Sequence, residues 1–228
     1  MKKKSVVLFS GGLDSTTVLA MAQNKNEEVY TLTFDYGQRH AIEIERAFTL
    51  AQKMKVKEHK VAKIDLRIFG GSSLTANLDV PKNRKKQDFE NHIPITYVPA
   101  RNTIFLSYAL AYAEVLKAQS IYIGVNALDY SGYPDCRPQY IEAFQNMANL
   151  ALKQTIEGEK ITIETPILMM SKKEIILTGI KLGVDYAKTH SCYDPDIKGR
   201  ACGGCDSCIL RKKAFEEAQV PDPTQYIL

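Results

Sequence analysis

The sequence lacks any long hydrophobic run. None of the apolar stretches in its 228 residues approaches the roughly 20 residues that a helix needs to cross a bilayer. The N-terminal lysines, the apolar run Val6–Phe9 and the small residues Ala20 and Ala22 imitate a secretory signal peptide. However, Ser-Gly-Gly interrupts this run early, and Asp14 lies where a signal peptide would be hydrophobic. We therefore expect a cytoplasmic protein.

The sequence also lacks a strong excess of one charge. It has 30 Lys and Arg against 26 Asp and Glu, a formal net charge of +4. A dedicated nucleic-acid binder usually concentrates more positive charge than this, so we expect no stable nucleic-acid binding. Small anionic ligands explain the mild excess equally well. No internal repeat or low-complexity segment is present, and the chain is long enough for one substantial core with a small appendage.

Segments typical of strands and of helices alternate along the first half of the chain. We expect strands at residues 5–9, 28–34, 58–66 and 120–125 and helices at residues 14–24, 41–55 and 102–117. The strands are nearly continuous apolar runs, which is typical of a parallel sheet covered on both faces. The alternation therefore predicts an α/β fold with a Rossmann-like, doubly wound, mostly parallel sheet. Ligands of such sheets bind beyond the carboxyl ends of the strands.

The second half continues this pattern after one irregular stretch. We expect helices at residues 139–155 and 171–182, a short strand at 160–164, and a last helix from about Asp206 to before Pro221. Ser171 and Glu174 have the spacing of a capping box. Between residues 70 and 93 the chain is polar and charged and longer than an ordinary connection, which predicts either a flexible loop or a lid over a site.

The segment Ser10–Ser15, with the sequence SGGLDS, connects the first expected strand to the first helix. Two glycines allow backbone N–H groups to approach phosphate oxygens, and the positive end of the helix favours an anion. No lysine follows Gly12, as it would in the G-x-x-x-x-G-K-[ST] loop, so transfer of a terminal phosphoryl group is not favoured. A simpler interpretation is a tight turn in which Asp14 caps the helix by accepting from the amide of Thr17.

S-G-G-x-D-S at the first strand-to-helix turn resembles the signature of the PP-loop ATP pyrophosphatases, whose fold is of the HUP type. This family cleaves ATP between the α and β phosphates and adenylates its substrate. The resemblance implies that ATP binds here together with Mg²⁺, and that Asp14 is catalytic. The nucleotide-binding residues that it implies are Phe9, Ser10, Gly11, Gly12, Leu13, Asp14, Ser15, Thr16, Thr17, Val18 and Leu19.

Four of the five cysteines lie close together near the C-terminus, at Cys192, Cys202, Cys205 and Cys208. Because disulfides are disfavoured in the cytoplasm, this spacing indicates a metal site. Four thiolates suit a structural Zn²⁺ ion, and an iron–sulfur cluster is also compatible with the spacing. We expect zinc in a small C-terminal subdomain, residues 186–228, which follows a nucleotide-binding and catalytic domain of residues 1–185.

Further motifs narrow the resemblance and extend it over nearly the whole chain. They are FDYGQRH at residues 34–40, VPARN at 98–102, GVN at 124–126 and DYSGYPDCRP at 129–138. Together with the loop and the cysteines, they resemble the 7-cyano-7-deazaguanine synthases of queuosine biosynthesis. The resemblance implies an ATP-dependent carbon–nitrogen ligase. Its substrates are 7-carboxy-7-deazaguanine and ammonia, and its product is the nitrile, formed through an adenylated carboxylate and an amide.

Individual roles follow from the same resemblance. Arg101 offers a fixed fork of donors to phosphate charge at a strand-to-helix junction, and is otherwise a surface ion-pair partner. Lys172 matches a phosphate-binding lysine of PP-loop enzymes; without that match, a solvated lysine is the better interpretation because cations are unfavourable at a helix N-terminus. Both are expected to be catalytic. A pocket for the flat base is expected from Tyr130, Tyr133, Asp135 and Arg137.

Three other functions are considered at this stage. The first is a tRNA-modifying PP-loop enzyme of the thiolating or lysidine-forming type, and the second is a nucleotide-sensing module stabilised by its metal. The third, an amidation like that of NAD or GMP synthetases, shares the loop but lacks support from the segment of residues 130–138. Thiolation needs a cysteine that carries sulfur. Cys136 lies beside the expected base pocket and either lines it or acts covalently. We expect a homodimer, since symmetric dimers are the commonest oligomers.

Overall fold

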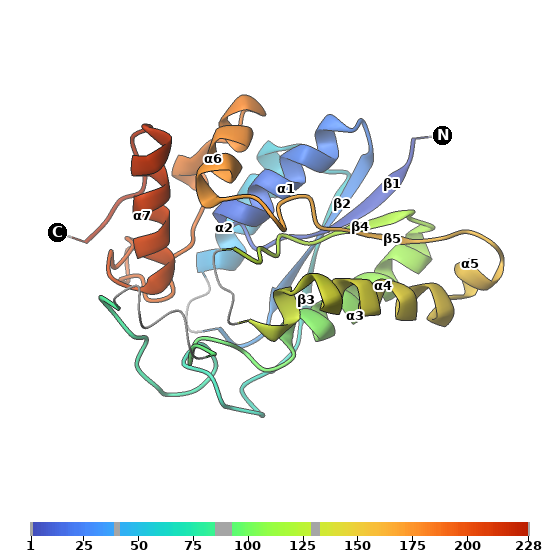
Figure 1. The fold of residues 1–228 in the computed structure, drawn as a ribbon, viewed down its shortest axis with the longest axis horizontal. Coiled ribbons are helices and arrows are strands. Elements are labelled where there is room, and N and C mark those ends of the chain that lie inside the picture. Colours follow the sequence, from blue (N-terminus) through green and yellow to red (C-terminus); the bar gives the residue numbers. More distant parts are fainter. Residues whose placement is uncertain (1, 39–41, 85–92, 129–132, 228) are drawn as a thin grey trace.

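Five parallel strands form the centre of the computed structural model, which describes residues 2–38, 42–84, 93–128 and 133–227. They are β1 (Lys4–Leu8), β2 (Glu28–Asp35), β3 (Glu58–Lys63), β4 (Ser120–Tyr122) and β5 (Thr162–Glu164). Their spatial order is β3-β2-β1-β4-β5 (Figure 1). The direction of winding therefore reverses between β1 and β4, the point where doubly wound sheets bind ligands. The predicted fold class is confirmed.

The helices pack on both faces of this sheet (Figure 1). They are α1 (Leu13–Asn24), α2 (Ile42–Lys53), α3 (Arg101–Leu116), α4 (Pro138–Ala151), α5 (Lys153–Ile156), α6 (Lys172–Lys181) and α7 (Asp206–Ala218), with short 3-10 turns η2 (Pro134–Cys136) and η3 (Tyr186–Lys188). No helix in the described ranges is both long enough and apolar enough to cross a membrane.

Strand β1 separates the two halves of the core. Val6 and Leu8 face the apolar cluster that contains the buried side chains of α3 and α4. Val7 and Phe9 face the other cluster, formed with α1, α2, α6 and α7. This alternation follows from the two-residue period of a strand, and it explains why the segment is apolar throughout. The chain therefore leaves the sheet at residue 9 from a position that is buried on both sides.

The single helix expected at residues 139–155 is interrupted, so that prediction was wrong. Leu152 has extended backbone angles (φ −97°, ψ 143°) and separates α4 from α5. Its side chain is buried, and the next amide, that of Lys153, donates to Glu114 Oε1 at 2.6 Å. The burial of Leu152 and the hydrogen bond to α3 are therefore more favourable than the backbone hydrogen bonds that one continuous helix would form. By contrast, the capping box of Ser171 and Glu174 at the start of α6 is confirmed.

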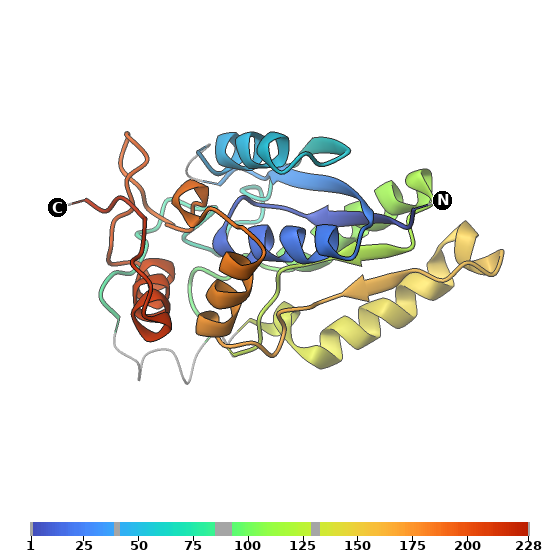
Figure 2. The same cartoon turned by 90° about the horizontal axis from the view of Figure 1, so that it is seen from above.

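The C-terminal region lies at the carboxyl end of the sheet, with α7 beyond the ends of the strands (Figures 1 and 2). Its residues join both halves of the core, for example Phe215 on one side and Cys192 on the other. Within the irregular stretch, Asn83 N donates to the carbonyl of Gly204 at 2.8 Å. The described part of that stretch is thus attached to the C-terminal region. Residues 85–92 lie outside the described residues, and a lid remains a prediction.

Candidate active site

The loop after β1 holds its shape through close backbone packing. Gly11 has φ +73°, and a Cβ there would lie 2.8 Å from the backbone nitrogen of Ala47 in α2. Gly12 is the N-cap of α1 and has no side-chain capping bond. Two features therefore require glycine at position 11: a left-handed backbone conformation and the approach of a second helix. The prediction that Asp14 caps α1 was wrong, because the cap lies two residues earlier.

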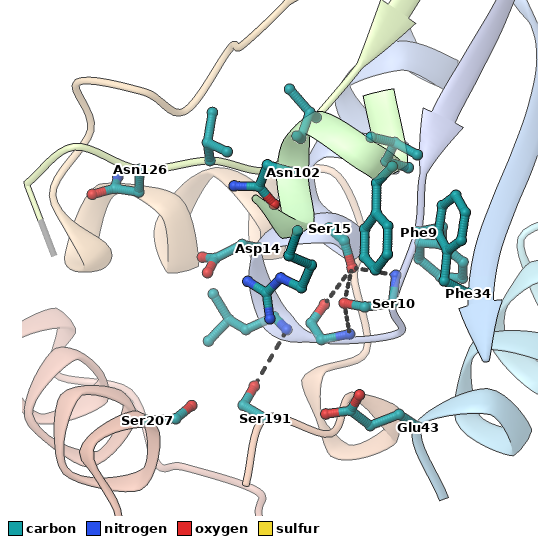
Figure 3. Close-up of a pocket in the computed structure, with 18 of the residues that line it drawn as sticks. Phe9, Ser10, Asp14, Ser15, Phe34, Glu43, Asn102, Asn126, Ser191 and Ser207 are labelled. Carbon is teal, nitrogen blue, oxygen red and sulfur yellow. Dashed lines mark hydrogen bonds between the residues drawn. The ribbon is translucent and has the colours of Figure 1, made fainter. Parts of the chain in front are cut away.

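Two serine hydroxyls organise the inside of this loop. Ser15 Oγ accepts from the amide of Ser10 at 3.2 Å and lies 3.1 Å from Ser10 Oγ, which accepts from the amide of Gly12 at 3.3 Å (Figure 3). The loop therefore curls around its own hydroxyls. The first turn of an α-helix has N–H groups without helical partners, and the residues at the start of α1, Leu13, Asp14 and Ser15, line the cavity described below. Such an arrangement suits the oxygens of a polyphosphate.

Asp14 forms an ion pair with Lys172 across the cavity. Lys172 Nζ lies 2.8 Å from Asp14 Oδ1 and 2.7 Å from Oδ2. The lysine side chain is 16% exposed and the aspartate side chain is 31% exposed. Lys172 is the first residue of α6, where the helix dipole disfavours a cation, and the carboxylate of Asp14 offsets this unfavourable interaction. The structure thus brings together two of the three residues expected to be catalytic.

Arg101, the third, begins α3 after Ala100, which has left-handed backbone angles (φ 55°, ψ 19°). Burial acts to lower the pKa of Arg101, but the nearby Tyr36 and Tyr133 outweigh it, and the net pKa is raised. The guanidinium therefore stays charged. Burial also raises the pKa of Glu43 in α2 to about 7, against the opposing effect of Arg101. A carboxyl that titrates near neutral pH thus lies close to a permanent cation.

One cavity of about 290 Å³ lies at the carboxyl ends of β1, β2 and β4 (Figure 3). It is lined by the loop after β1 and by Asp14, Glu43, Arg101 and Lys172. Its apolar wall includes Phe34 and Phe105, whose rings are stacked with centroids 3.9 Å apart. Ile123 and Val125 continue this wall. Its polar part is made by the loop, Asp14, Lys172 and Arg101. The cavity therefore combines a surface for flat rings with donors for anions.

The implied nucleotide-binding segment contributes unequally to this cavity. Phe9, Ser10, Gly12, Leu13, Asp14 and Ser15 line it. Gly11 does not line it and instead packs against the backbone of α2, as described above. Thr16, Thr17, Val18 and Leu19 do not line it: Val18 and Leu19 are fully buried in the core, and the hydroxyls of Thr16 and Thr17 donate to the carbonyls of Gly12 and Leu13. Direct contact with a ligand is therefore restricted to the loop and the first turn of α1.

The residues expected to bind the base have three different environments. Tyr133 lines the cavity, and its hydroxyl lies 2.9 Å from Thr96 Oγ1. Asp135 is buried behind the wall and accepts from the amide of Asn102 at 3.1 Å, so it fixes the start of α3. Arg137 is exposed, does not line the cavity, and donates to the carbonyl of Pro134 at 3.1 Å. Tyr130 lies outside the described residues.

Cys136 lines the cavity as a buried thiol. Burial raises its pKa to about 12, with a further contribution from Asp135. Asn102 Nδ2 donates to its sulfur at 3.5 Å. Because the thiolate is the nucleophilic form, this environment favours a lining role over covalent chemistry.

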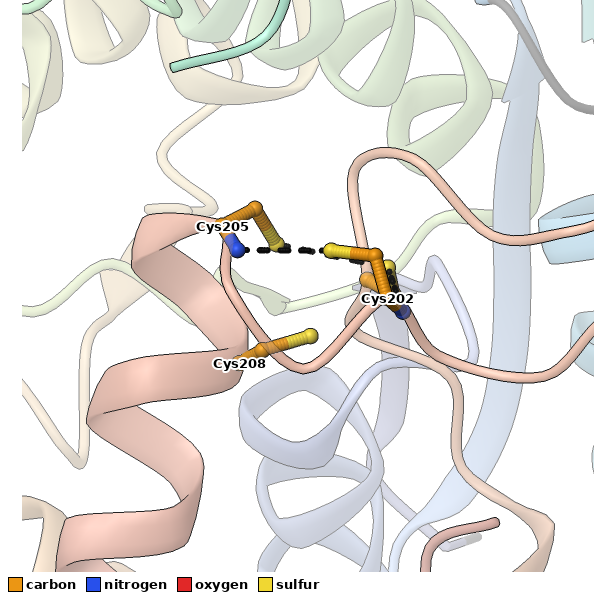
Figure 4. A group of neighbouring side chains, drawn as sticks. Cys202, Cys205 and Cys208 are labelled. Carbon is orange, nitrogen blue, oxygen red and sulfur yellow. Dashed lines mark hydrogen bonds between the residues drawn. The ribbon is translucent and has the colours of Figure 1, made fainter. Parts of the chain in front are cut away.

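The four clustered cysteines form a compact group whose sulfurs lie within 4.8 Å of one another. Figure 4 shows Cys202, Cys205 and Cys208 with converging side chains, the last from the first turn of α7. Zinc–sulfur bonds of about 2.3 Å in a tetrahedron place sulfurs about 3.8 Å apart, which this group can reach with small shifts. Amides of Cys202 and Asp194 donate to Cys192 Sγ at 3.2 and 3.3 Å, as is favourable for a thiolate. The residues therefore fit a tetrahedral metal ion, as predicted.

Some residues of the cavity wall were not identified from the sequence. Glu43 lies in a helix with an exposed polar face, where a carboxylate is normally solvated. Ser191 is adjacent to a cysteine ligand, and nothing in its local pattern indicates a ligand contact. Both positions depend on how distant elements pack, namely α2 against β2 and the cysteine loop against α1. Asn126, by contrast, lies in one of the motifs above, and its Nδ2 donates to the carbonyls of Ile167 and Met170 at 2.8 and 2.7 Å.

Comparison with known proteins gave matches over almost the entire chain. A family model described as "Queuosine biosynthesis protein QueC" matches residues 4–219. A 7-cyano-7-deazaguanine synthase from Desulfatibacillum aliphaticivorans is 62% identical over 227 residues, 99% of this chain and 97% of the relative. One from Myxococcus xanthus is 59% identical over 226 residues, 99% and 98% of the two chains. Among solved structures, NMN synthetase from Francisella tularensis matches with a TM-score of 0.51 at 16% identity, covering 96% of this chain and 78% of the other, a likeness of fold alone.

Proposed function

Because the chain belongs to the queuosine biosynthesis protein QueC family, we propose that it is an ATP-dependent carbon–nitrogen ligase that makes 7-cyano-7-deazaguanine from 7-carboxy-7-deazaguanine and ammonia. The relatives cited above carry the name of this synthase. We expect the reaction to take place in the cytoplasm.

The observation that carries this proposal is the meeting of three elements in one cavity. The loop after β1 offers N–H groups and hydroxyls, Lys172 and Arg101 offer positive charge, and the aromatic wall offers flat surface. A nucleotide needs the first two and a deazaguanine ring needs the third. This arrangement supports a reaction in which a purine-like carboxylate approaches the phosphates of ATP.

In the first step a carboxylate oxygen of the substrate attacks the α-phosphorus of ATP. The bond between that phosphorus and the bridging oxygen to the β-phosphate breaks, and pyrophosphate leaves. The loop N–H groups and Lys172 hold the charge that accumulates on pyrophosphate, and Arg101 stabilises the α-phosphoryl group in the transition state. Activation is required because the unactivated carboxylate would have to expel oxide. Ammonia then attacks the acyl carbon, AMP leaves, and a proton is lost, which gives the amide.

The second step removes the amide oxygen. The amide oxygen attacks the α-phosphorus of a second ATP and pyrophosphate leaves. The carbon–oxygen bond then breaks, AMP leaves with that oxygen, and the nitrogen loses its two protons, which gives the nitrile. In both steps an oxygen on the same carbon of the substrate is the nucleophile, and pyrophosphate is the leaving group. One site therefore serves for both. Glu43, which titrates near neutral pH in the wall of this cavity, is placed to accept a proton from nitrogen.

Two metals accompany this function. Mg²⁺ bound with ATP would neutralise the leaving pyrophosphate, and Asp14, the carboxylate in the first turn of α1, would hold it. Zn²⁺ would be held by the four cysteines, and since all four ligands are protein thiolates it would stabilise the fold and not activate water. We expect the whole protein to be a homodimer, which sedimentation of the purified enzyme would test.

The test is a product assay with the purified protein. The full chain is mixed with ATP, Mg²⁺, ammonium and 7-carboxy-7-deazaguanine, and the products are followed by mass spectrometry. Nitrile formation supports both steps. Accumulation of amide alone supports only the first, and absence of pyrophosphate release with this substrate contradicts the proposal. Omission of ammonium is the control, because adenylation alone should then be observed.

A tRNA-thiolating activity is less well supported. That chemistry needs a reactive cysteine near the nucleotide, whereas the thiol of Cys136 has a pKa raised to about 12. The relatives at high identity carry the name of the synthase. The ammonia-using reaction needs no thiol nucleophile, in agreement with this environment.

A further inference from the structure

The segment between η3 and Cys192 connects two parts of the molecule. They are the loop after β1, here called the phosphate loop, and the four clustered cysteines, here called the metal group. The amide of His190 donates to the carbonyl of Gly11 at 3.0 Å. Ser191 Oγ accepts from the amide of Leu13 at 3.4 Å, and the next residue is the ligand Cys192. Two consecutive residues therefore contact the loop immediately before the chain reaches the metal group.

The hydroxyl of Ser191 can donate a hydrogen bond to an anion. A serine hydroxyl can donate one hydrogen bond while its oxygen accepts another. Here the oxygen accepts from Leu13, and across the described ranges no bond in which this hydroxyl donates is observed. Ser191 lines the cavity, and Figure 3 shows it beside the loop with Glu43 and Ser207 on the same side. Its proton is thus available to an oxygen of a bound phosphate.

The position of Ser191 is fixed on both sides along the chain. Upstream, Tyr186 OH lies 2.7 Å from Thr17 Oγ1 in α1, and Arg211 donates to Thr189 Oγ1 at 2.8 Å. Downstream, the sulfur of Cys192 belongs to the cysteine group. Because a serine hydroxyl extends only a short distance from the backbone, a shift of Cys192 moves it out of reach of Leu13. The metal group is therefore positioned to control where this donor points.

We propose that Ser191 binds the phosphate chain of ATP, and that a metal ion held by Cys192, Cys202, Cys205 and Cys208 keeps its hydroxyl in the binding position. This inference rests on the proposed function for the identity of the ligand. The metal would then have a role in nucleotide binding as well as in folding, because loss of the metal would remove one hydrogen-bond donor from the nucleotide site.

The first test compares binding of magnesium and a nonhydrolysable α,β-methylene ATP analogue by calorimetry. Ser191→Ala is expected to weaken binding roughly tenfold or more, since a hydrogen bond to a charged group is lost. Ser191→Thr keeps the hydroxyl and should restore binding to within about threefold. Lys198→Ala is the matched control, because Lys198 is an exposed residue of the same loop. Equal affinity of Ser191→Ala and wild type overturns the inference.

The second test adds the metal. The analogue is titrated into metal-loaded and chelator-treated samples of wild type and of Ser191→Ala, and thermal unfolding identifies samples that remain folded. Metal removal should weaken binding in wild type and cause little further loss in Ser191→Ala, because the same donor is already absent. An equal loss in both proteins overturns the coupling. If metal removal unfolds both proteins, a role of the metal besides folding is overturned, and the metal-loaded comparison above then decides only the role of Ser191.

The same measurements separate this inference from the proposed function. If metal-loaded wild type binds no analogue, the assignment of an ATP site fails, and the inference fails with it. If wild type binds and Ser191→Ala binds equally well, the ATP site stands and only the role of Ser191 is refuted.

Discussion

Replacing Gly11 by alanine tests how the phosphate loop is held. The left-handed backbone at this position (φ +73°) costs a residue with a Cβ about 1–2 kcal/mol. The new Cβ would also lie 2.8 Å from the backbone nitrogen of Ala47, and a rigid helix must move to relieve it, which costs about 1–3 kcal/mol more. The sum of about 2–5 kcal/mol corresponds to a fall of roughly 4–10 °C in unfolding temperature for a chain of this length.

Gly183→Ala is the matched control for this change. Gly183 has φ +79°, and nothing lies within 4 Å of the Cβ that it would gain. It should show the backbone cost alone, a fall of roughly 2–4 °C. Differential scanning calorimetry measures both variants, and titration with the ATP analogue should show weaker binding only in Gly11→Ala. If the two variants unfold together and bind the analogue equally, the close approach of α2 does not shape the loop.

Three further predictions concern charge and metal. Lys172→Met should lower kcat roughly a hundredfold, as for other donors to developing charge, and a kcat within threefold of wild type in steady-state assays contradicts its role. The pKa of Glu43 is raised from its ordinary value of 4.5 to about 7 in the folded protein. The contribution of this group to the free energy of unfolding is therefore fully present below pH 4.5 and is lost as the pH rises through 7. Between pH 5 and 8 the unfolding temperature of wild type should therefore fall relative to Glu43→Gln, and parallel pH profiles refute the burial of that carboxyl. Cys205→Ser should reduce bound metal, measured by elemental analysis, and lower the unfolding temperature; normal values of both exclude a metal scaffold.

The sequence was sufficient for those parts of the fold that depend on local pattern. The apolar strands, the loop after β1 and the capping box of Ser171 follow from spacing over a few residues. The break at Leu152 was missed because it depends on tertiary contacts, namely the burial of Leu152 and the bond that the amide of Lys153 donates to Glu114 in another helix. The carboxyl ends of β3 and β4 were also placed too late. For β4 the reason is that the following residues, among them Ile123 and Val125, line the cavity.

Where a motif carried the chemistry, the sequence pointed to residues that the structure brings together. Asp14, Arg101, Lys172 and Tyr133 lie at one cavity, and the four cysteines lie together. The motif that contains Asp135 was located correctly, but its buried carboxylate holds a helix start, which spacing alone does not reveal. The wall residues Glu43 and Ser191 arise from tertiary packing, and neither helical periodicity nor turn composition encodes that information.

The ion pair between Asp14 and Lys172 has a consequence for selectivity. With the two side chains bound to each other, the lysine charge is already compensated, so a bare sulfate or phosphate would gain little from Lys172 and would leave the aspartate without a counter-charge. In the proposed ATP site, a triphosphate that arrives with its own divalent cation would exchange both partners at once, since the cation would take the carboxylate and the phosphate would take the lysine. Charge would be balanced before and after such an exchange, so this pair would favour a metal-bound triphosphate over a simple anion.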